Sequence, residues 1–235
     1  MIIAIDGPSG SGKSTVAKEL AKRLGFACLD TGAMYRAVTY RGLQMGFDLV
    51  SITDLDAPDA PQDVREALVK VANDEPIAFE YDEFGQPIKV EIGGQDVTVQ
   101  IRTKEVDSTV SVVSACKDIR TALVAQQRII GAASDTIIEG RDIGTVVFPN
   151  AELKVFLTAS AEARAHRRVL QNAQRGVGDT DEQATLELMK YRDKYDSSRA
   201  NSPLSQAEDA ILVDSTDMTF EEVVERIIEL AQERM

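Results

Sequence analysis

Residues 7–14, Gly-Pro-Ser-Gly-Ser-Gly-Lys-Ser, match the pattern G-x-x-x-x-G-K-[ST] and constrain the fold more than any other segment. The apolar run at residues 2–5 comes directly before them and is typical of a strand buried on both faces. After them, apolar residues recur at helical spacing until Gly25. A strand, a glycine-rich turn and a helix in this order form a P-loop. The chain is therefore predicted to be an α/β protein built on a parallel sheet.

Four further apolar runs are separated by stretches with helical spacing, as expected for the remaining strands of such a sheet. With residues 2–5 they predict a doubly wound sheet of five parallel strands flanked by helices. Ligands bind such sheets at the carboxyl ends of the strands, so side chains that follow these runs are candidates for a site. The four runs are residues 27–29, 136–138, 153–157 and 210–213.

The segment from Asp48 to Asp107 breaks this rhythm. It holds 15 acidic and 5 basic residues, a net charge of −10, whereas the whole chain carries −13. Two alternating runs, residues 77–81 and 88–92, predict an antiparallel hairpin, and a third short strand is expected at residues 97–101. We therefore expect a small antiparallel domain at residues 51–107, inserted into a core domain of residues 1–50 and 108–235.

Composition excludes several classes of protein. Of the 235 residues 43% are hydrophobic and 28% charged, as in globular domains rather than disordered chains. No apolar run approaches the ~18 residues that span a bilayer, and the N-terminus lacks the basic leader of a signal peptide. We expect a cytoplasmic protein with no membrane partner and two reduced, packed thiols at Cys28 and Cys116. The acidic charge argues against a nucleic-acid partner.

The residue types of the P-loop suit a nucleotide phosphate. Its glycines let successive backbone N–H groups face an anion, and the N-terminus of the following helix adds partial positive charge. Lys13 is expected to reach the β- and γ-phosphates of the nucleotide, and the Ser14 hydroxyl to ligate Mg²⁺. A merely flexible Gly-Ser turn is the alternative. The predicted cofactor-binding residues are Gly7, Pro8, Ser9, Gly10, Ser11, Gly12, Lys13, Ser14 and Thr15.

A P-loop is shared by kinases, GTPase switches and ATPase motors, so other motifs must separate these classes. A guanine-reading Asn-Lys-x-Asp sequence is absent. The only Asp-x-x-Gly sequence, residues 82–85, falls in the predicted hairpin turn rather than after a core strand. Both observations weaken the interpretation as a GTPase switch.

Two further segments place polar side chains at strand ends. Residues 30–36 follow the second strand and open a helix, which puts the Thr31 hydroxyl and, one turn later, Arg36 at the carboxyl edge of the sheet. An ordinary helix cap with a surface arginine would give the same pattern. Residues 139–145 repeat the arrangement after the third strand, where Arg141 can bind phosphate with two parallel hydrogen bonds. Together the segments predict a second anion site.

Arg192, Asp196 and Arg199 stand at positions i, i+4 and i+7, on one face of a helix expected to begin near Thr180. These side chains can bind a polar ligand. The alternative is a solvent-exposed Arg–Asp ion pair that contributes little to stability.

A cluster of arginines precedes the flexible sequence Gly176-Val177-Gly178, which suits a lid that closes over phosphates at residues 168–178. A solvated basic helix is the alternative. His166, among them, is expected to be a surface or packing residue rather than a general base. The cluster comprises Arg164, Arg167, Arg168 and Arg175.

In order and spacing, six segments of the chain resemble the nucleoside monophosphate kinase family, in particular its bacterial cytidylate kinases. The P-loop alone does not single out that family, and adenylate and shikimate kinases are not expected to carry the other five segments. The resemblance covers nearly the whole chain and implies a P-loop kinase fold. The segments are residues 5–15, 29–36, 101–106, 139–149, 165–168 and 191–193.

This resemblance implies transfer of the γ-phosphoryl group of ATP to CMP, or to dCMP, with Mg²⁺ as cofactor. Lys13, Arg141 and Arg168 would be the catalytic residues. Residues matching those that bind the acceptor phosphate are Arg36, Arg141 and Arg199. Ribose would be bound by Arg192 and Asp196, and cytosine by Ser111, Arg120 and Asp142.

The acidic insertion matches the enlarged monophosphate-binding domain of the bacterial enzymes, and the arginine-rich stretch matches their short lid. Thr31 and Glu139 stand where some relatives carry Ser and Asp. Thr31 keeps the hydroxyl and is retained as a substrate-binding residue, and Glu139 lies directly before the more specific Gly-Arg-Asp sequence. Neither departure is expected to disturb the assignment to the family much. The partners are expected to be nucleotides only, bound by a monomer.

Two alternatives stay open. A catalytically idle nucleotide-binding protein could have the same fold, because a fold does not determine function. Among active kinases, the acceptor could be another nucleotide such as UMP or AMP.

Overall fold

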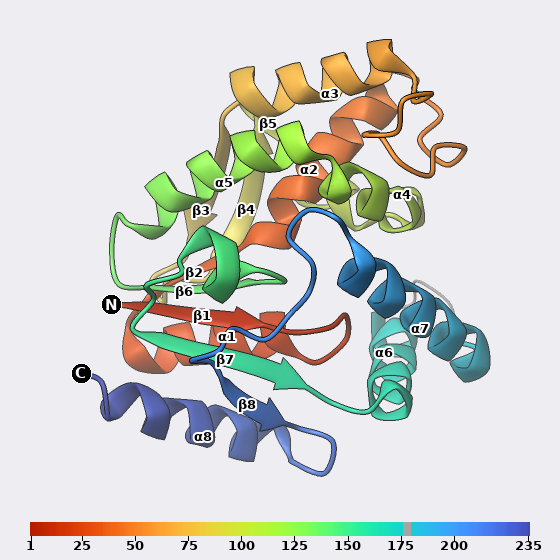
Figure 1. The fold of residues 1–235 in the computed structure, drawn as a ribbon. Helices are drawn as coiled ribbons and strands as arrows, with labels where there is room; N and C mark the ends of the chain where they lie inside the picture. Colours follow the sequence, from red (N-terminus) through yellow and green to blue (C-terminus); the bar gives the residue numbers. More distant parts are fainter. Residues whose placement is uncertain (176–179) are drawn as a thin grey trace.

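The computed structural model describes residues 1–175 and 180–235, with the side chains of residues 174 and 175 left out of the description. Its central sheet has five parallel strands in the order β2-β6-β1-β7-β8 (Figure 1), which confirms the predicted fold class. Each apolar run forms its strand, with ends that differ by one or two residues. The strands are β1 (Ile2–Asp6), β2 (Ala27–Asp30), β6 (Thr136–Gly140), β7 (Leu153–Thr158) and β8 (Ile211–Asp214).

The strand order brings three site-bearing strand ends together. Asp6, the last residue of β1, lies in register with Gly140 of β6, and Asp30 of β2 lies in register with Glu139. The P-loop therefore leaves the sheet next to the two segments that were predicted to form the second anion site.

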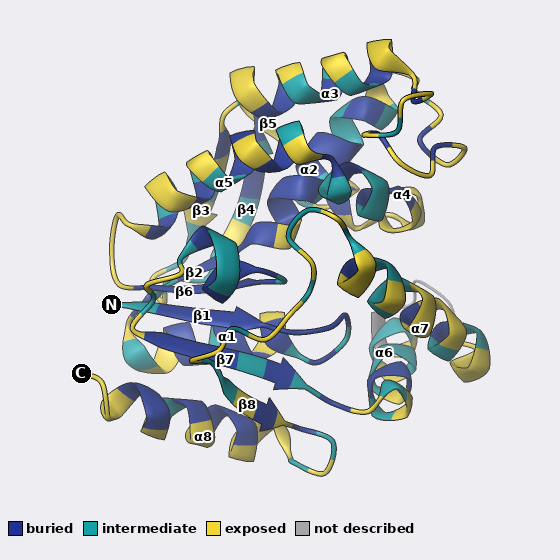
Figure 2. Ribbon diagram, in the orientation of Figure 1, coloured by how far each residue is buried: buried dark blue, intermediate teal, exposed yellow. Residues whose placement is uncertain are grey.

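Helices cover both faces of the sheet. One face carries α1 (Lys13–Leu24) and α8 (Phe220–Gln232), whose apolar side chains pack against β1 and β7. The other carries α2 (Thr31–Gln44), α4 (Lys104–Ala115) and α5 (Lys117–Gly131), as Figure 1 shows. Strands β1, β2 and β6 are buried almost throughout and β7 over most of its length, whereas only Val213 of β8 is buried. The outer faces of the helices are exposed (Figure 2). The burial explains why the strands appear in the sequence as continuous apolar runs.

The acidic segment contains the predicted hairpin, β3 (Ile77–Tyr81) and β4 (Pro87–Ile92). It also contains a helix that the sequence analysis did not identify, α3 (Gln62–Asp74). The signal for this helix was present, because Val64, Leu68 and Val71 are buried at helical spacing.

The third strand of the small sheet is not where it was expected. β5 comprises only Gln95–Asp96, and residues 97–101 form a turn that runs into the short 3₁₀ helix η1 (Gln100–Arg102). Gly93 and Gly94 both have positive φ angles, so the chain reverses within two residues and the returning strand starts early. It also ends early, because the Thr98 hydroxyl, rather than a backbone carbonyl, accepts the hydrogen bond from the Val90 N–H.

The turn of the hairpin is anchored to the edge of the main sheet. The Cys28 N–H donates a 3.0 Å hydrogen bond to the Gly85 carbonyl. Gly85 has a φ of 72°, and a Cβ added there would lie 2.3 Å from the Phe26 carbonyl oxygen. Only glycine allows the turn to approach β2 this closely.

The insertion shares its hydrophobic core with the helices on its side of the sheet. Leu68 of α3, Val90 of β4 and Ile101 belong to one buried cluster with Met34 of α2 and Leu123 of α5. Apolar packing is therefore continuous from the small sheet to the central sheet.

The two remaining helices lie side by side beyond the carboxyl edge of the sheet (Figure 1). They are α6 (Ala161–Arg175) and α7 (Glu182–Ser198), and Arg164 of α6 forms a 2.6 Å ion pair with Asp193 of α7. Because α7 ends at Ser198, Arg199 lies beyond the helix rather than on the helical face where it was expected. None of the helices in the described part of the chain has both the length and the apolar composition needed to cross a membrane.

Candidate active site

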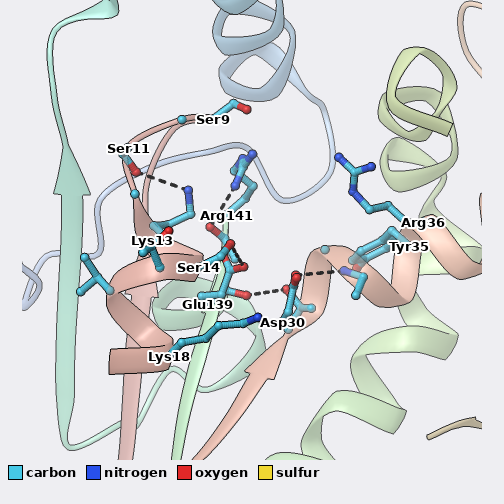
Figure 3. Close-up of a pocket in the computed structure, with 18 of the residues that line it drawn as sticks. Ser9, Ser11, Lys13, Ser14, Lys18, Asp30, Tyr35, Arg36, Glu139 and Arg141 are labelled. Atoms are coloured by element: carbon cyan, nitrogen blue, oxygen red, sulfur yellow. Dashed lines mark hydrogen bonds between the residues drawn. The ribbon is translucent and has the colours of Figure 1, made fainter. Parts of the chain in front are cut away.

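A cavity of about 1040 Å³ opens at the carboxyl ends of β1, β2 and β6. Figure 3 shows P-loop side chains on one side of it and Arg36 and Tyr35 of α2 on the other. Most of the predicted site residues line it, but Gly7, Pro8 and Ser111 do not. Those that do are Ser9, Gly10, Ser11, Gly12, Lys13, Ser14, Thr15, Thr31, Arg36, Arg120, Arg141, Asp142, Arg168, Arg192, Asp196 and Arg199.

The P-loop has the backbone geometry that its glycines were expected to allow. Gly7, Gly10 and Gly12 all have positive φ, and Gly12 immediately precedes α1. Gly7 does not face the cavity, and a Cβ at this position would come within 2.0 Å of the Leu157 carbonyl oxygen. Its role is therefore the close packing of the loop on β7 rather than contact with a ligand.

Lys13 is folded back onto its own loop. Its Nζ donates a 2.7 Å hydrogen bond to the Pro8 carbonyl and lies 3.4 Å from the Ser11 hydroxyl. The side chain is buried, and this burial, reinforced by repulsion from Arg141, lowers the pKa of Lys13 to about 7. An anionic phosphate at this place would favour the charged ammonium.

Ser14 contacts a carboxylate that was not among the predicted site residues. The Ser14 hydroxyl donates a hydrogen bond to Oε1 of Glu139, at the end of β6 (Figure 3). Burial, with repulsion from Asp30, raises the pKa of Glu139 to about 7. The Thr31 hydroxyl donates to the Glu139 carbonyl at 2.8 Å, which joins α2 to the same strand. Glu139 is thus central to the site, a position that was not predicted for it from the sequence.

Asp6 supports the segment that follows β6. Its two carboxylate oxygens accept hydrogen bonds from the Ile143 N–H (2.8 Å) and the Gly144 N–H (2.7 Å). These amides begin η2 (Ile143–Val147), a single turn of π-helix. Burial raises the pKa of Asp6 to about 6. This role of Asp6 was not predicted from the sequence, although Asp6 directly precedes the P-loop.

The arginines of the second anion site converge on one buried carboxylate. Asp196 accepts a hydrogen bond from Arg141 Nε at 3.1 Å on one oxygen and from Arg199 on the other. Although burial acts in the opposite direction, Arg141 and Arg199 hold the pKa of Asp196 below its usual range. Burial, with repulsion from Arg141, lowers the pKa of Arg192 to about 10. Arginine side chains this close together repel one another. The negative charge of a bound phosphate would offset that repulsion.

Arg36 is engaged with the end of the insertion. Its guanidinium donates a 3.0 Å hydrogen bond to the Ile101 carbonyl and pairs with Asp107 of α4. A second ion pair joins the same two segments. Here Arg102, which follows the small sheet, pairs with Asp30, the N-cap residue of α2, at 3.1 Å. Arg102 lines the cavity and was not among the predicted site residues. Two arginine contacts therefore tie α2 to the segment that follows the small sheet.

A second buried ion pair lies at the far end of the cavity, between Arg120 of α5 and Asp142. Arg120 also donates to the Ser114 carbonyl at 3.1 Å. Ser114, rather than the predicted Ser111, presents its hydroxyl to this region and accepts a 3.0 Å hydrogen bond from Arg199. Helix α4 turns Ser111 away from the cavity wall, since only Val110 and Ser114 of that helix line it.

The arginines of α6 meet the P-loop side of the cavity. Arg164 donates to the Ser9 carbonyl at 2.9 Å, and Arg167 donates to the Ser215 hydroxyl at 3.0 Å. Arg167 and Arg168 line the cavity. His166 is exposed and lies 3.2 Å from Glu182 of α7, as expected for a surface residue. Residues 176–178 of the predicted lid lie outside the described residues.

A P-loop facing a second arginine-lined anion site across one cavity defines a phosphotransferase of the P-loop kinase class. Comparison with known proteins agrees. The family model described as "Cytidylate kinase" matches residues 3–233, and the chain belongs to the cytidylate kinase family.

Three curated relatives are all named cytidylate kinase. That of Citrifermentans bemidjiense is 44% identical over 235 residues, which cover 100% of this chain and 94% of the relative. That of Exiguobacterium sibiricum is 46% identical, with 98% and 96% covered. That of Streptococcus pneumoniae is 45% identical, with 99% and 98% covered.

Proposed function

We propose that this protein transfers the γ-phosphoryl group of ATP to CMP, and to dCMP, to give ADP and the corresponding diphosphate. The observation that carries the proposal is the buried Arg120–Asp142 pair, which shares one cavity with the P-loop and the arginine cluster. The pair offers a donor and an acceptor to a base at a fixed distance from the phosphate-binding groups. Cytosine needs an acceptor for its amino group, and Asp142 supplies one.

The catalytic roles follow from how charge is distributed in phosphoryl transfer. Negative charge is spread over the transferring group, so fixed positive charges stabilise the transition state. In the proposal Lys13 contacts that group from the donor side, Arg141 from the acceptor side, and Arg168 from α6. Arg36 and Arg199 hold the acceptor phosphate, while Arg192 and Asp196 bind ribose.

The oxygen groups beside the P-loop fit Mg²⁺. The Ser14 hydroxyl and the Glu139 carboxylate are hard oxygen donors in contact with one another. Within the described residues no group of three or more His, Cys, Asp or Glu side chains is arranged to hold a metal alone. Mg²⁺ commonly takes its other ligands from phosphates and water, so Ser14 as ligand with Glu139 beside it is a sufficient protein contribution. When bound, the ion neutralises charge on the phosphates.

The division into parts also belongs to the proposal. Residues 1–50 and 108–235 form the core domain, residues 51–107 close on the acceptor, and residues 168–178 close on the donor. Closure would exclude water and so limit hydrolysis of ATP. Because one chain supplies every proposed site residue, we propose a monomer, acting in the cytoplasm where its nucleotides occur.

The test is a panel of nucleoside monophosphates, each with ATP and Mg²⁺, with ADP release as the readout. We expect the highest kcat/KM for CMP, activity with dCMP, and much lower values for UMP, AMP and GMP. A higher kcat/KM for UMP or AMP would reassign the acceptor. No ADP release with any of them, from protein that binds ATP, would support an idle nucleotide-binding protein instead.

A further inference from the structure

A group of buried polar atoms lies at the wall of the cavity that carries the Arg120–Asp142 pair. Gln127 of α5 is 1% exposed, and neither its Nε2 nor its Oε1 has a hydrogen-bond partner among the described residues. The Tyr35 hydroxyl and Arg120 Nε are in the same situation. A buried polar group without a partner costs roughly 1–3 kcal/mol, so three of them at one place call for a functional explanation.

The three side chains are brought together by two helices. Arg120 and Gln127 are seven residues apart on α5, which places them two turns apart on one face of that helix. The guanidinium carbon of Arg120 lies 5.4 Å from the centroid of the Tyr35 ring, within the range of a cation–π contact. Tyr35 and Arg120 line the cavity, whereas Gln127 does not.

Gln127 of α5 and Tyr35 of α2 lie on helices that pack against each other. Burial raises the pKa of Tyr35, and the neighbouring Gln127 side chain opposes that rise, as a group close to the hydroxyl would. A carboxamide and a phenol have complementary donors and acceptors, so they can satisfy one another directly or through one shared water. Tyr35, Arg120 and Asp142 thus line the cavity, and Gln127 is the member of this group that does not reach it.

We propose that Gln127 and Tyr35 are positioning residues for base selection. Gln127 holds the Tyr35 hydroxyl, the Tyr35 ring supports the guanidinium of Arg120, and Arg120 fixes the carboxylate of Asp142. The inference rests on the proposed function and adds to it two residues, one of which does not reach the cavity.

Selectivity should depend on this support more than turnover does. Cytosine and uracil carry the same ribose phosphate and differ at the base edge, where an amino group is replaced by a carbonyl oxygen. The phosphate-binding arginines lie on α2, directly after β6 and directly after α7, and their hydrogen bonds go to groups other than Gln127. A small displacement of Arg120 and Asp142 would therefore weaken the discrimination between bases while the phosphate contacts persist.

The experiment compares Gln127→Leu, Tyr35→Phe and the double variant with the wild type. Gln127→Leu keeps the approximate volume and removes the amide, and Tyr35→Phe removes only the hydroxyl. The matched control is Gln126→Leu. Gln126 is the adjacent glutamine, and it donates to the Ala72 carbonyl at 2.8 Å and accepts from the Ile77 N–H, away from the cavity. Steady-state kinetics with CMP and UMP, ATP affinity and Tm are measured for each.

For Gln127→Leu we expect the CMP:UMP ratio of kcat/KM to fall about tenfold, chiefly through a higher KM for CMP, with ATP affinity unchanged. Tyr35→Phe should change the ratio in the same direction. The double variant should be no worse than Gln127→Leu alone, because the two groups act as one unit. Gln126→Leu should lower Tm and leave the ratio at its wild-type value.

A wild-type CMP:UMP ratio in folded Tyr35→Phe and Gln127→Leu would overturn the inference. If Gln127→Leu does not fold, Tyr35→Phe decides, since it removes a single oxygen atom. Asp142→Asn separates this inference from the proposed function. A ratio that falls in Asp142→Asn but not in the other variants retains the proposed base contact and rejects the support behind it. A wild-type protein without preference for CMP overturns both.

Discussion

The Ser14 hydroxyl at the start of α1 donates a hydrogen bond to the Glu139 carboxylate at the end of β6. This contact joins residues 125 positions apart, and both side chains line the cavity. It places the Glu139 carboxylate beside the hydroxyl that is proposed to ligate Mg²⁺. Burial raises the pKa of this carboxylate to about 7.

We expect Glu139→Gln to require a higher Mg²⁺ concentration for half-maximal activity, by about tenfold or more, because the amide keeps a hydrogen bond to Ser14 but loses the charge. A Mg²⁺ titration of the initial rate measures this. Glu152→Gln is the control, since Glu152 accepts from the Ile2 N–H at the other end of β1. An unchanged Mg²⁺ requirement in Glu139→Gln would remove Glu139 from the metal site.

Lys13→Ala should lower kcat by about 10²–10³ with the fold intact, because one preorganised charge on the transferring group is lost. Circular dichroism and turnover are measured on the same sample. The control is Lys18→Ala, which removes an ammonium from the same helix one and a half turns further on. A folded Lys13→Ala variant with wild-type turnover would contradict the assignment of the P-loop lysine.

ATP binding should be coupled to proton uptake at pH 8. In the free protein the pKa of Lys13 is lowered to about 7, chiefly by burial, so the amine is mostly neutral at this pH. A bound phosphate favours the ammonium and raises that pKa, so binding must take a proton from solution. The pKa values of Asp6, about 6, and Glu139, about 7, leave both carboxyls mostly ionised at pH 8.

Calorimetry without Mg²⁺, in buffers of different ionisation enthalpy, measures this uptake. We expect up to one proton per ATP in the wild type, and none in Lys13→Met. The same binding heat in every buffer would show that Lys13 is already charged in the free protein.

We expect Asp107 to compete with the acceptor for Arg36. The two side chains form an ion pair, and Asp107 also acts electrostatically on Arg192. Asp107→Asn should therefore lower the KM for CMP about two- to fivefold, the range expected for a partly exposed ion pair. Asp118→Asn, which breaks the pair with Arg65 away from the cavity, should leave KM unchanged. A raised KM in Asp107→Asn would mean that the pair preorganises Arg36 instead.

Acceptor binding should order the insertion. Hydrogen exchange with CMP present should slow the amides of residues 77–92 and 100–107 together, because Arg36 contacts the Ile101 carbonyl and would also hold the acceptor phosphate. ATP alone should not produce this protection. The Cys28 amide, which already donates to the Gly85 carbonyl, serves as the internal reference. No CMP-dependent protection would leave the small sheet as a passive cover of the edge of β2.

Much of the fold could be predicted from short segments of the sequence. A strand buried on both faces needs an unbroken apolar run, and a P-loop needs its glycines between a strand and a helix, so residues 2–14 predicted their structure without reference to the rest of the chain. The hairpin followed from alternation around a turn. The third strand was misplaced because its length was decided by the Gly93–Gly94 reversal and by the Thr98 hydroxyl. The Gly93–Gly94 reversal and the Thr98 hydroxyl both determine how the returning chain pairs with β4.

The sequence by itself therefore determined the elements, the P-loop and the arginines available for a second anion site. Only the tertiary structure decided which side chains meet. Glu139 faces Ser14 because β6 pairs with β1, and Ser114 rather than Ser111 faces the cavity because of how α4 packs on α2. Gln127 supports Tyr35 across two helices that are separated by the whole insertion. Local propensity and periodicity act over a few residues, whereas a site depends on packing between elements a hundred residues apart.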